Sequence, residues 1–233
     1  MTAPVEQTKA QKVVPWGRSF QEYLRMFALS GNDLASGVLD CAAGPAGFNA
    51  EMHRRGHKAV SCDPLYRLSA PQISHEIENT FAAILKTTEE HRANFIWRDI
   101  ASPEELGQLR MQAMNQFLAD LPAGACEGRY VIAALPALPF RDCQFGIALC
   151  SHFLFTYTNA LSLLFHLEAI GEMCRVATEA RIFPLIPSFE TARSPYVAPL
   201  LEQLASTGYA CEVEFVPYEF QRGANEMLRV RRL

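Results

Sequence analysis

The apolar positions along the chain predict helices that alternate with short buried strands. Residues 16–29 carry their apolar side chains at the spacing of one helix face. Residues 37–43 and 57–63 are short apolar runs that predict buried strands, and residues 46–56 between them predict a helix that ends at Gly56. Strand, helix and strand in so short a stretch form a βαβ unit, which implies a parallel sheet.

Residues 65–128 depart from this alternation. They are richer in charged residues and predict two helices, over 71–91 and 103–121. A parallel crossover needs only about a dozen residues, so this stretch is too long for a plain connection. Two interpretations stay open: a helical insertion over one edge of the sheet, or extra helices that thicken the core.

Alternation resumes after this stretch and continues along the rest of the chain. Strands are predicted over 129–135, 145–151 and 180–186, and helices over 159–177 and 196–208. The last two strands, 209–220 and 225–233, flank a Gln-Arg-Gly-Ala turn and are therefore antiparallel. The pattern predicts one α/β domain over residues 1–233. Its sheet is doubly wound, seven-stranded and mostly parallel, with an antiparallel last strand and the helical insertion after the second strand.

Composition narrows the class of protein. Hydrophobic residues make up 49% of the 233 residues and charged residues 20%, which is enough for a sizeable core. The net charge of −4 predicts no general attraction to nucleic acid or to an anionic membrane. Seven scattered cysteines without a C-x-x-C pair favour a reducing compartment and predict no metal site. With neither a signal peptide nor a long apolar stretch, the expectation is a cytoplasmic protein without a membrane span.

The candidate ligand site is the loop after the first predicted strand, within Val-Leu-Asp-Cys-Ala-Ala-Gly-Pro-Ala-Gly-Phe (38–48). Ligands of such sheets bind at the carboxyl ends of the strands. Gly44 can adopt a positive φ and lets a ligand approach the backbone, while Pro45 stiffens the loop. The free N–H groups of a helix that begins near Ala46 favour a carboxylate or a phosphate.

An acidic residue ends the second predicted strand. Asp63, followed by Pro64, lies at a spacing from Gly44 at which an acid commonly accepts hydrogen bonds from both ribose hydroxyls of a nucleoside. An aspartate before a proline is also common in turns. The loop and the acid at this spacing together favour a nucleoside site over a turn.

Two cofactors are compatible with the Gly44 loop and Asp63, and a further acidic residue distinguishes between them. A nicotinamide dinucleotide loop has the pattern G-x-G-x-x-G, which Ala42, Gly44 and Gly47 would fill. The pattern D-x-G-x-G-x-G is filled instead by Asp40, Ala42, Gly44 and Ala46. Asp40 favours the second pattern, because a carboxylate suits the ammonium and the sulfonium of S-adenosylmethionine.

These segments resemble the class I S-adenosylmethionine-dependent methyltransferases over nearly the whole chain apart from the insertion. Residues 38–48 look like the family's first motif and residues 61–66 like its second. Residues 134–155 and 172–186 resemble the regions around its fourth and fifth strands. The resemblance implies S-adenosyl-L-methionine as cofactor and methyl transfer to a small-molecule acceptor. The cofactor residues that it implies are Asp40, Ala42, Gly44, Pro45, Asp63, Pro64, Leu135 and Ser151.

The chain also departs from the family pattern. The loop keeps its shape if only Gly44 needs an unusual backbone conformation and Ala42 and Ala46 do not. The acid that often reaches the adenine amino group is replaced by Ala134, so backbone groups near Leu135 would recognise the adenine. Two alternatives stay open: a non-catalytic protein that binds S-adenosylmethionine or S-adenosylhomocysteine, and an NAD(P)-dependent oxidoreductase.

Candidate acceptor residues follow the fourth predicted strand, in Cys-Ser-His-Phe-Leu-Phe-Thr-Tyr (150–157). His152 has a side chain suited to general-base catalysis, or it caps the strand through hydrogen bonds. Tyr23, Phe153 and Tyr157 either line an acceptor pocket or belong to the core. Neither an Asn-Pro-Pro-Tyr nor a Pro-Cys sequence occurs, so methylation of nucleic-acid bases is not indicated.

Overall fold

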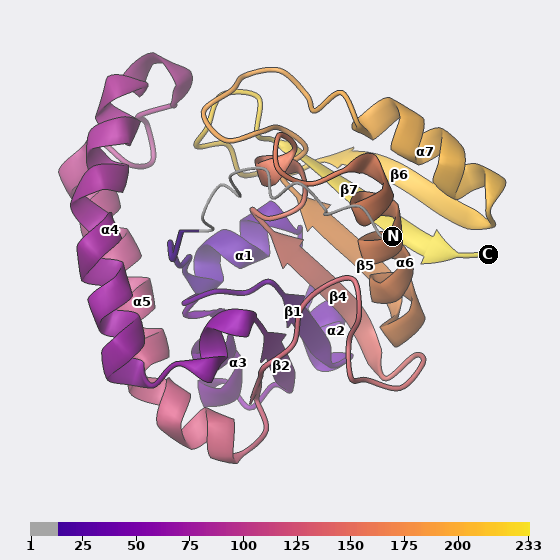
Figure 1. The fold of residues 1–233 in the computed structure, drawn as a ribbon, viewed down its shortest axis with the longest axis horizontal. Coiled ribbons are helices and arrows are strands. Elements are labelled where there is room, and N and C mark those ends of the chain that lie inside the picture. Colours follow the sequence, from indigo (N-terminus) through magenta and orange to yellow (C-terminus); the bar gives the residue numbers. More distant parts are fainter. Residues whose placement is uncertain (1–13) are drawn as a thin grey trace, which may run out of the picture.

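A computed structural model, which describes residues 14–233, places one seven-stranded sheet at the centre of the molecule (Figure 1). The strands are β1 (Val38–Cys41), β2 (Ala59–Cys62), β3 (Tyr130–Val131), β4 (Phe145–Ser151), β5 (Ala177–Phe183), β6 (Tyr209–Phe215) and β7 (Glu226–Arg232). Their order in the sheet is β3-β2-β1-β4-β5-β7-β6. β7 runs antiparallel to β5 and β6, and the other neighbours are parallel. The predicted fold class is confirmed.

Helices pack on both faces of the sheet because side chains alternate between the faces along each central strand. The α-helices are α1 (Phe20–Met26), α2 (Gly31–Ala35), α3 (Phe48–Arg54), α4 (Ala70–Glu90), α5 (Pro103–Cys126), α6 (Leu163–Val176) and α7 (Val197–Ser206). Val38 and Ile147 are buried in a cluster with side chains of α1 and α3. Leu39 and Ala148, their neighbours in sequence, are buried in a second cluster with side chains of α6 and α7.

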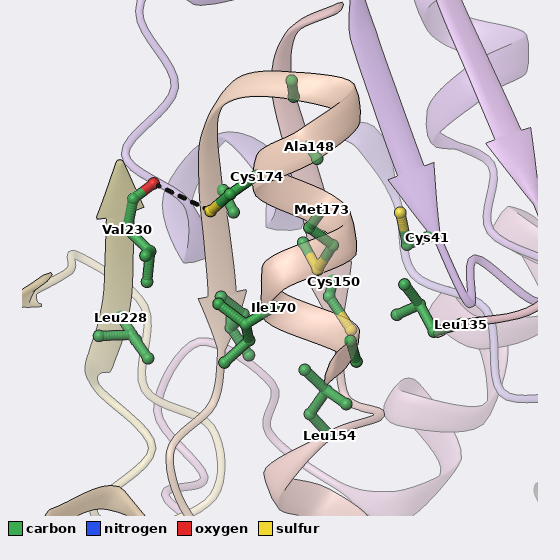
Figure 2. Packing of buried hydrophobic residues seen from close by; sticks show 14 of the residues in the cluster. Cys41, Leu135, Ala148, Cys150, Leu154, Ile170, Met173, Cys174, Leu228 and Val230 are labelled. Carbon is green, nitrogen blue, oxygen red and sulfur yellow. Dashed lines mark hydrogen bonds between the residues drawn. The ribbon is translucent and has the colours of Figure 1, made fainter. Parts of the chain in front are cut away.

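The buried apolar cluster that packs against α6 includes several cysteine side chains (Figure 2). Cys41 and Cys150 are register partners on β1 and β4, and both are fully buried. The Cys174 thiol donates to the carbonyl oxygen of Val230 at 3.8 Å. Burial raises the pKa of Cys150 to about 12, so the thiol stays protonated at neutral pH. These cysteines act as small apolar side chains of the core.

The third and sixth strands are shortened the most relative to the predicted bounds. The third strand pairs only over Tyr130–Val131, because the chain turns at Ala134, whose carbonyl accepts the N–H of Ala137 at 3.1 Å. β6 ends at Phe215, ahead of Pro217, which has no N–H to donate to a ladder. The connection between the last two strands is therefore a loop, residues 216–225, instead of a tight turn.

Other helix and strand boundaries also differ from the predicted ones. β5 begins at Ala177, directly after α6, and ends ahead of Pro184, three residues earlier than the predicted strand. α2 was not predicted, although Ser30 and Asp33 form the capping box that marks a helix start. None of the helices within residues 14–233 is long and apolar enough to cross a membrane.

The two helices of the 65–128 stretch, α4 and α5, lie side by side along one flank of the molecule (left in Figure 1). α5 packs against α3 and β3, and short 3₁₀ turns at Pro64–Arg67 and Arg92–Asn94 flank α4. The buried face of α5 includes Leu106, Ala113, Met114 and Phe117 at helical spacing. Arg110 occupies the same face and is only 1% exposed.

Candidate functional site

The loop after β1 folds sharply at the carboxyl end of the sheet. Ala42 and Gly44 both have left-handed backbone conformations, with φ of 51° and 54°. Ala42 thus adopts an unusual conformation as well as Gly44, at a steric cost that glycine would not have, and the loop forms nonetheless. A Cβ atom at position 44 would meet no other heavy atom within 4 Å, so the loop presents bare backbone to open space there.

The end of β2 holds this loop in place. The Oδ2 of Asp63 accepts the N–H of Gly44 at 2.9 Å, and its Oδ1 accepts the N–H of Leu65 at 2.7 Å. The hydroxyl of Tyr66 donates to the carbonyl oxygen of Gly44 at 2.8 Å. Burial raises the pKa of Asp63, and the two N–H donors act against that rise. Each carboxylate oxygen accepts one of these bonds and has a further lone pair.

Residues 14–18, which we call the strap, lie across the same loop. A Cβ atom on Gly17 would be 2.0 Å from the carbonyl oxygen of Pro45, so only glycine permits this approach. The carbonyl of Arg18 accepts the N–H of Gly47 at 3.0 Å, and the N–H of Val14 donates to the hydroxyl of Tyr157 at 3.3 Å. The strap thus connects the loop after β1 to the turn after β4.

A cavity of about 610 Å³, the first cavity, lies between the loop, the strap and the end of β4. This volume is within the range of small-molecule sites. The structure brings together in its wall most of the site residues predicted from sequence, namely Tyr23, Ala42, Gly44, Pro45, Asp63, Pro64, Leu135, Ser151, His152, Phe153 and Tyr157. Sequence reasoning missed Arg67, Leu68 and Glu76, because they come from the insertion, which matches no motif.

Asp40 is the predicted cofactor residue that the structure does not place in this wall. It is fully buried, and the hydroxyl of Tyr23 donates to its Oδ2 at 3.1 Å. Burial raises the pKa of Asp40 well above its usual range and so favours the uncharged acid. Asp40 is directed to the face of the sheet that α1 covers, where it is hydrogen-bonded to Tyr23, a residue that lines the cavity.

A second cavity of about 410 Å³ adjoins the first. The residues that line both are Val14, Trp16, Arg18, His152 and Tyr157. The remaining wall of the second cavity comes from α4, α5, Phe95, Thr156 and the segments 188–189 and 218–224. The strap and the turn after β4 therefore form a common wall between two spaces of similar size.

His152 lies in this common wall, at the carboxyl end of β4. Its backbone is left-handed, with φ of 49°, and its N–H donates to the carbonyl of Phe183 at 2.7 Å. The ring Nδ1 is 2.9 Å from the Oγ of Ser151. Burial, together with the charges of Arg18 and Arg110, lowers the pKa of His152 well below 6.5. The imidazole is therefore neutral at pH 7, and its lowered pKa makes it a weaker proton acceptor than an exposed histidine.

A buried charged cluster in the wall of the second cavity was not predicted. The Nη1 of Arg110 is 2.7 Å from the carboxylate of Glu22, which also accepts the hydroxyl of Tyr218 at 2.9 Å. The sequence carries one signal for it: Arg110 occupies an apolar position in the helical repeat of α5. A buried arginine needs a partner, but its partners come from α1 and the 216–225 loop, so the sequence does not reveal them.

Comparison with known proteins gives one relative in sequence and several in fold. No family model matches the chain. The uncharacterized protein MJ0045 of Methanocaldococcus jannaschii is 33% identical over 221 residues, which cover 93% of this chain and 95% of that protein.

Three solved structures are similar at low identity. Magnesium protoporphyrin IX methyltransferase from Synechocystis PCC 6803 is 11% identical, with a TM-score of 0.47 over 92% of this chain and 78% of that chain. A methyltransferase from Aquifex aeolicus is 14% identical, with a TM-score of 0.42 over 91% and 88%. A TehB-like methyltransferase from Corynebacterium glutamicum is 12% identical, with a TM-score of 0.46 over 92% and 87%. The strand order of this chain, with antiparallel β7, is typical of such enzymes.

Proposed function

This chain belongs to the same protein family as MJ0045 of Methanocaldococcus jannaschii and has the class I methyltransferase fold, and on that basis we propose that it methylates a small molecule, with S-adenosylmethionine as cofactor. One observation carries the proposal. The cavity that contains Asp63 and the Gly44 loop adjoins a second cavity, and His152 lies in the wall that the two share. The first cavity would hold the cofactor and the second the acceptor.

The residues of the first cavity fit this cofactor. The carboxylate oxygens of Asp63 have lone pairs for ribose hydroxyls beyond those that bind Gly44 and Leu65. The open space at the Cβ position of Gly44 leaves room for the methionine end. Leu135 and Ala134 line the same cavity and offer backbone groups to an adenine.

The chemistry requires little from the protein beyond alignment. S-adenosylmethionine, when bound, supplies a methyl group on a positively charged sulfur: the acceptor's lone pair forms the new bond, and the electron pair of the broken bond stays on sulfur. The protein would hold acceptor and cofactor in register and exclude water. Neutral His152 would take the proton that a protic acceptor releases.

Calorimetry of S-adenosylhomocysteine binding to the parent and to Asp63→Ala tests the cofactor assignment. Hydrogen bonds to a charged acceptor contribute about 1.5–3 kcal/mol. We therefore expect Asp63→Ala to weaken S-adenosylhomocysteine by about ten- to a hundred-fold. Asp99→Ala, which removes an exposed aspartate paired with Arg25, is the matched control and should bind like the parent.

Other outcomes separate the competing functions. If the protein binds NADP and does not bind S-adenosylhomocysteine, the result would contradict the proposal and favour an oxidoreductase. Binding of S-adenosylhomocysteine that is unaffected by Asp63→Ala would reject the role of Asp63 in the site. Binding with no transfer of labelled methyl groups into a small-molecule fraction would favour a non-catalytic binding protein.

A further inference from the structure

The second cavity contains a concentration of buried positive charge. Arg110 is 1% exposed, and Arg18 is partly buried in the wall common to both cavities. The Nε atoms of both are inaccessible to solvent and have no hydrogen-bond partner within residues 14–233. The two guanidinium groups are close enough for the charge of Arg110 to lower the pKa of Arg18, together with burial, to about 10.

Glu22 is the carboxylate that acts on both arginines. Burial would raise its pKa, but Arg110, a backbone N–H and Arg18 lower the pKa of Glu22 to about 2. At neutral pH all three groups are therefore charged, and His152 is not. Among the described residues that line the second cavity, none is acidic. Among the described residues of this cluster, two guanidinium groups accompany one carboxylate, which is an excess of one positive charge.

An excess buried charge is costly unless a counter-charge accompanies it. A ligand with one negative charge would balance the cluster, whereas a dianion such as a phosphate monoester would overcompensate it. Arginine pairs with a carboxylate through two parallel hydrogen bonds, which gives direction as well as energy. The charge balance therefore favours a monocarboxylate.

The rest of the second cavity is mostly apolar and aromatic. Its apolar wall includes Ile84, Phe95, Leu106, Phe189, Phe220 and Ala224. The rings of Phe95 and Phe220 are 5.0 Å apart, and those of Phe95 and Phe189 are 6.1 Å apart. Such a wall suits a hydrophobic, ring-containing body, because aromatic side chains pack against rings with favourable edge and face contacts.

We propose that the second cavity binds an apolar, ring-containing monocarboxylate and that Arg18 and Arg110 hold its carboxylate. The identification of this ligand as the methyl acceptor rests on the proposed function. The anion site itself does not, because it is built from residues of the second cavity and of the common wall.

Calorimetry with matched acids and amides tests the proposal. The probes are 3-phenylpropanoate, indole-3-acetate and biphenyl-4-carboxylate, each against its primary amide, with the full chain both free and saturated with S-adenosylhomocysteine. The amide keeps the shape of each acid and removes the charge. We expect at least one acid to bind about tenfold or more tightly than its amide.

Arg18 variants then locate the anion. Arg18→Gln should remove the preference for the acid, and Arg18→Lys should keep part of it because it retains the charge. Arg98→Gln, at an arginine that is 77% exposed, is the matched control and should keep the parent's preference. S-adenosylhomocysteine affinity is measured on Arg18→Gln in parallel, because Arg18 also lines the first cavity.

The results separate this proposal from the proposed function. An acid preference in a protein that does not bind S-adenosylhomocysteine would support the anion site and contradict the methyltransferase assignment. Amides that bind as tightly as the acids, or no binding in either series, would overturn the anion site. Arg18→Gln that weakens S-adenosylhomocysteine yet keeps the acid preference would also overturn it, since Arg18 would then serve the cofactor.

Discussion

The two cavities share a wall but are assembled in different ways. The first is built around two short segments, the loop after β1 and the end of β2, which are adjacent strands of the sheet. The second is enclosed by α4, α5, Phe95, Thr156, the common wall and the segments 188–189 and 218–224, which are far apart in the chain. Local backbone geometry shapes the first cavity, whereas long-range packing and buried charge shape the second.

The largest expected effect tests whether buried charge holds the second cavity together. Arg110→Met leaves Glu22 buried without its ion-pair partner, and we expect it to lower the free energy of unfolding by about 3–5 kcal/mol. Chemical denaturation measures this loss. The matched control is Arg98→Met, at an exposed surface pair, which should cost less than about 1 kcal/mol.

A double variant identifies the cause of that loss. Glu22→Gln combined with Arg110→Met removes the unpaired charge and should recover part of the stability, because the amide can still cap α1. If the double variant is no more stable than Arg110→Met, lost packing of the arginine, and not its charge, accounts for the effect.

The next effect concerns the common wall and depends on pH. The folded-state pKa of His152 is well below that of the unfolded chain, so its neutral form is favoured by folding. The contribution of His152 to the free energy of unfolding is complete above about pH 6.5. It is lost as the pH falls below that value, at up to about 1.4 kcal/mol per pH unit. Between pH 7 and pH 5 we expect the parent to lose more stability than His152→Gln, by up to about 2 kcal/mol.

Denaturation at a series of pH values measures this difference between the two profiles. His75→Gln, at an exposed histidine of α4, is the matched control and should follow the parent. Parallel profiles for the parent and His152→Gln would show that His152 is solvated enough to titrate normally, and the assignment of a neutral base in the wall would fail.

The smallest effect concerns the backbone of the first cavity. Ala42→Gly relieves a left-handed alanine and should stabilise the protein by up to about 1 kcal/mol, with S-adenosylhomocysteine affinity unchanged. Ala46→Gly is the matched control in the same loop. Ala46 does not have a positive φ, so glycine there should be neutral or cost up to about 1 kcal/mol. Equal effects of the two substitutions would contradict the strain at Ala42.

Much of the first cavity could be predicted from sequence because its groups follow each other closely in the chain. An apolar run that ends in a Gly-containing loop, and an acid at the end of the next strand, are local signals. Asp40 shows the limit of such reasoning. Its position in the motif was clear, but the alternation of side chains along β1 directs it to α1 and not to the cavity. Motif spacing does not state which face of a strand a residue occupies.

The second cavity was beyond prediction for a related reason. The chain pattern predicted α4 and α5 as helices but not which residues they would face. Arg110 is paired with Glu22 of α1 and lies close to Tyr218 of the last loop, so its role depends on tertiary contacts. A buried arginine requires an acidic or polar partner, and which residue provides it is known only from the folded structure. The β4 segment, by contrast, was predicted with the bounds that the structure has, because a continuous apolar run suffices to specify a central parallel strand.

Gly17 gives the molecule a further property. Its backbone lies directly against Pro45, with no space for even a methyl group, and the carbonyl of Arg18 accepts the N–H of Gly47, so the strap is in direct contact with the loop. Val14, Trp16 and Arg18 of that strap face both cavities. Any displacement of the strap caused by a molecule in one cavity therefore changes the free energy of occupying the other. By thermodynamic reciprocity, the first ligand alters the affinity of the second by the same factor as the second alters that of the first.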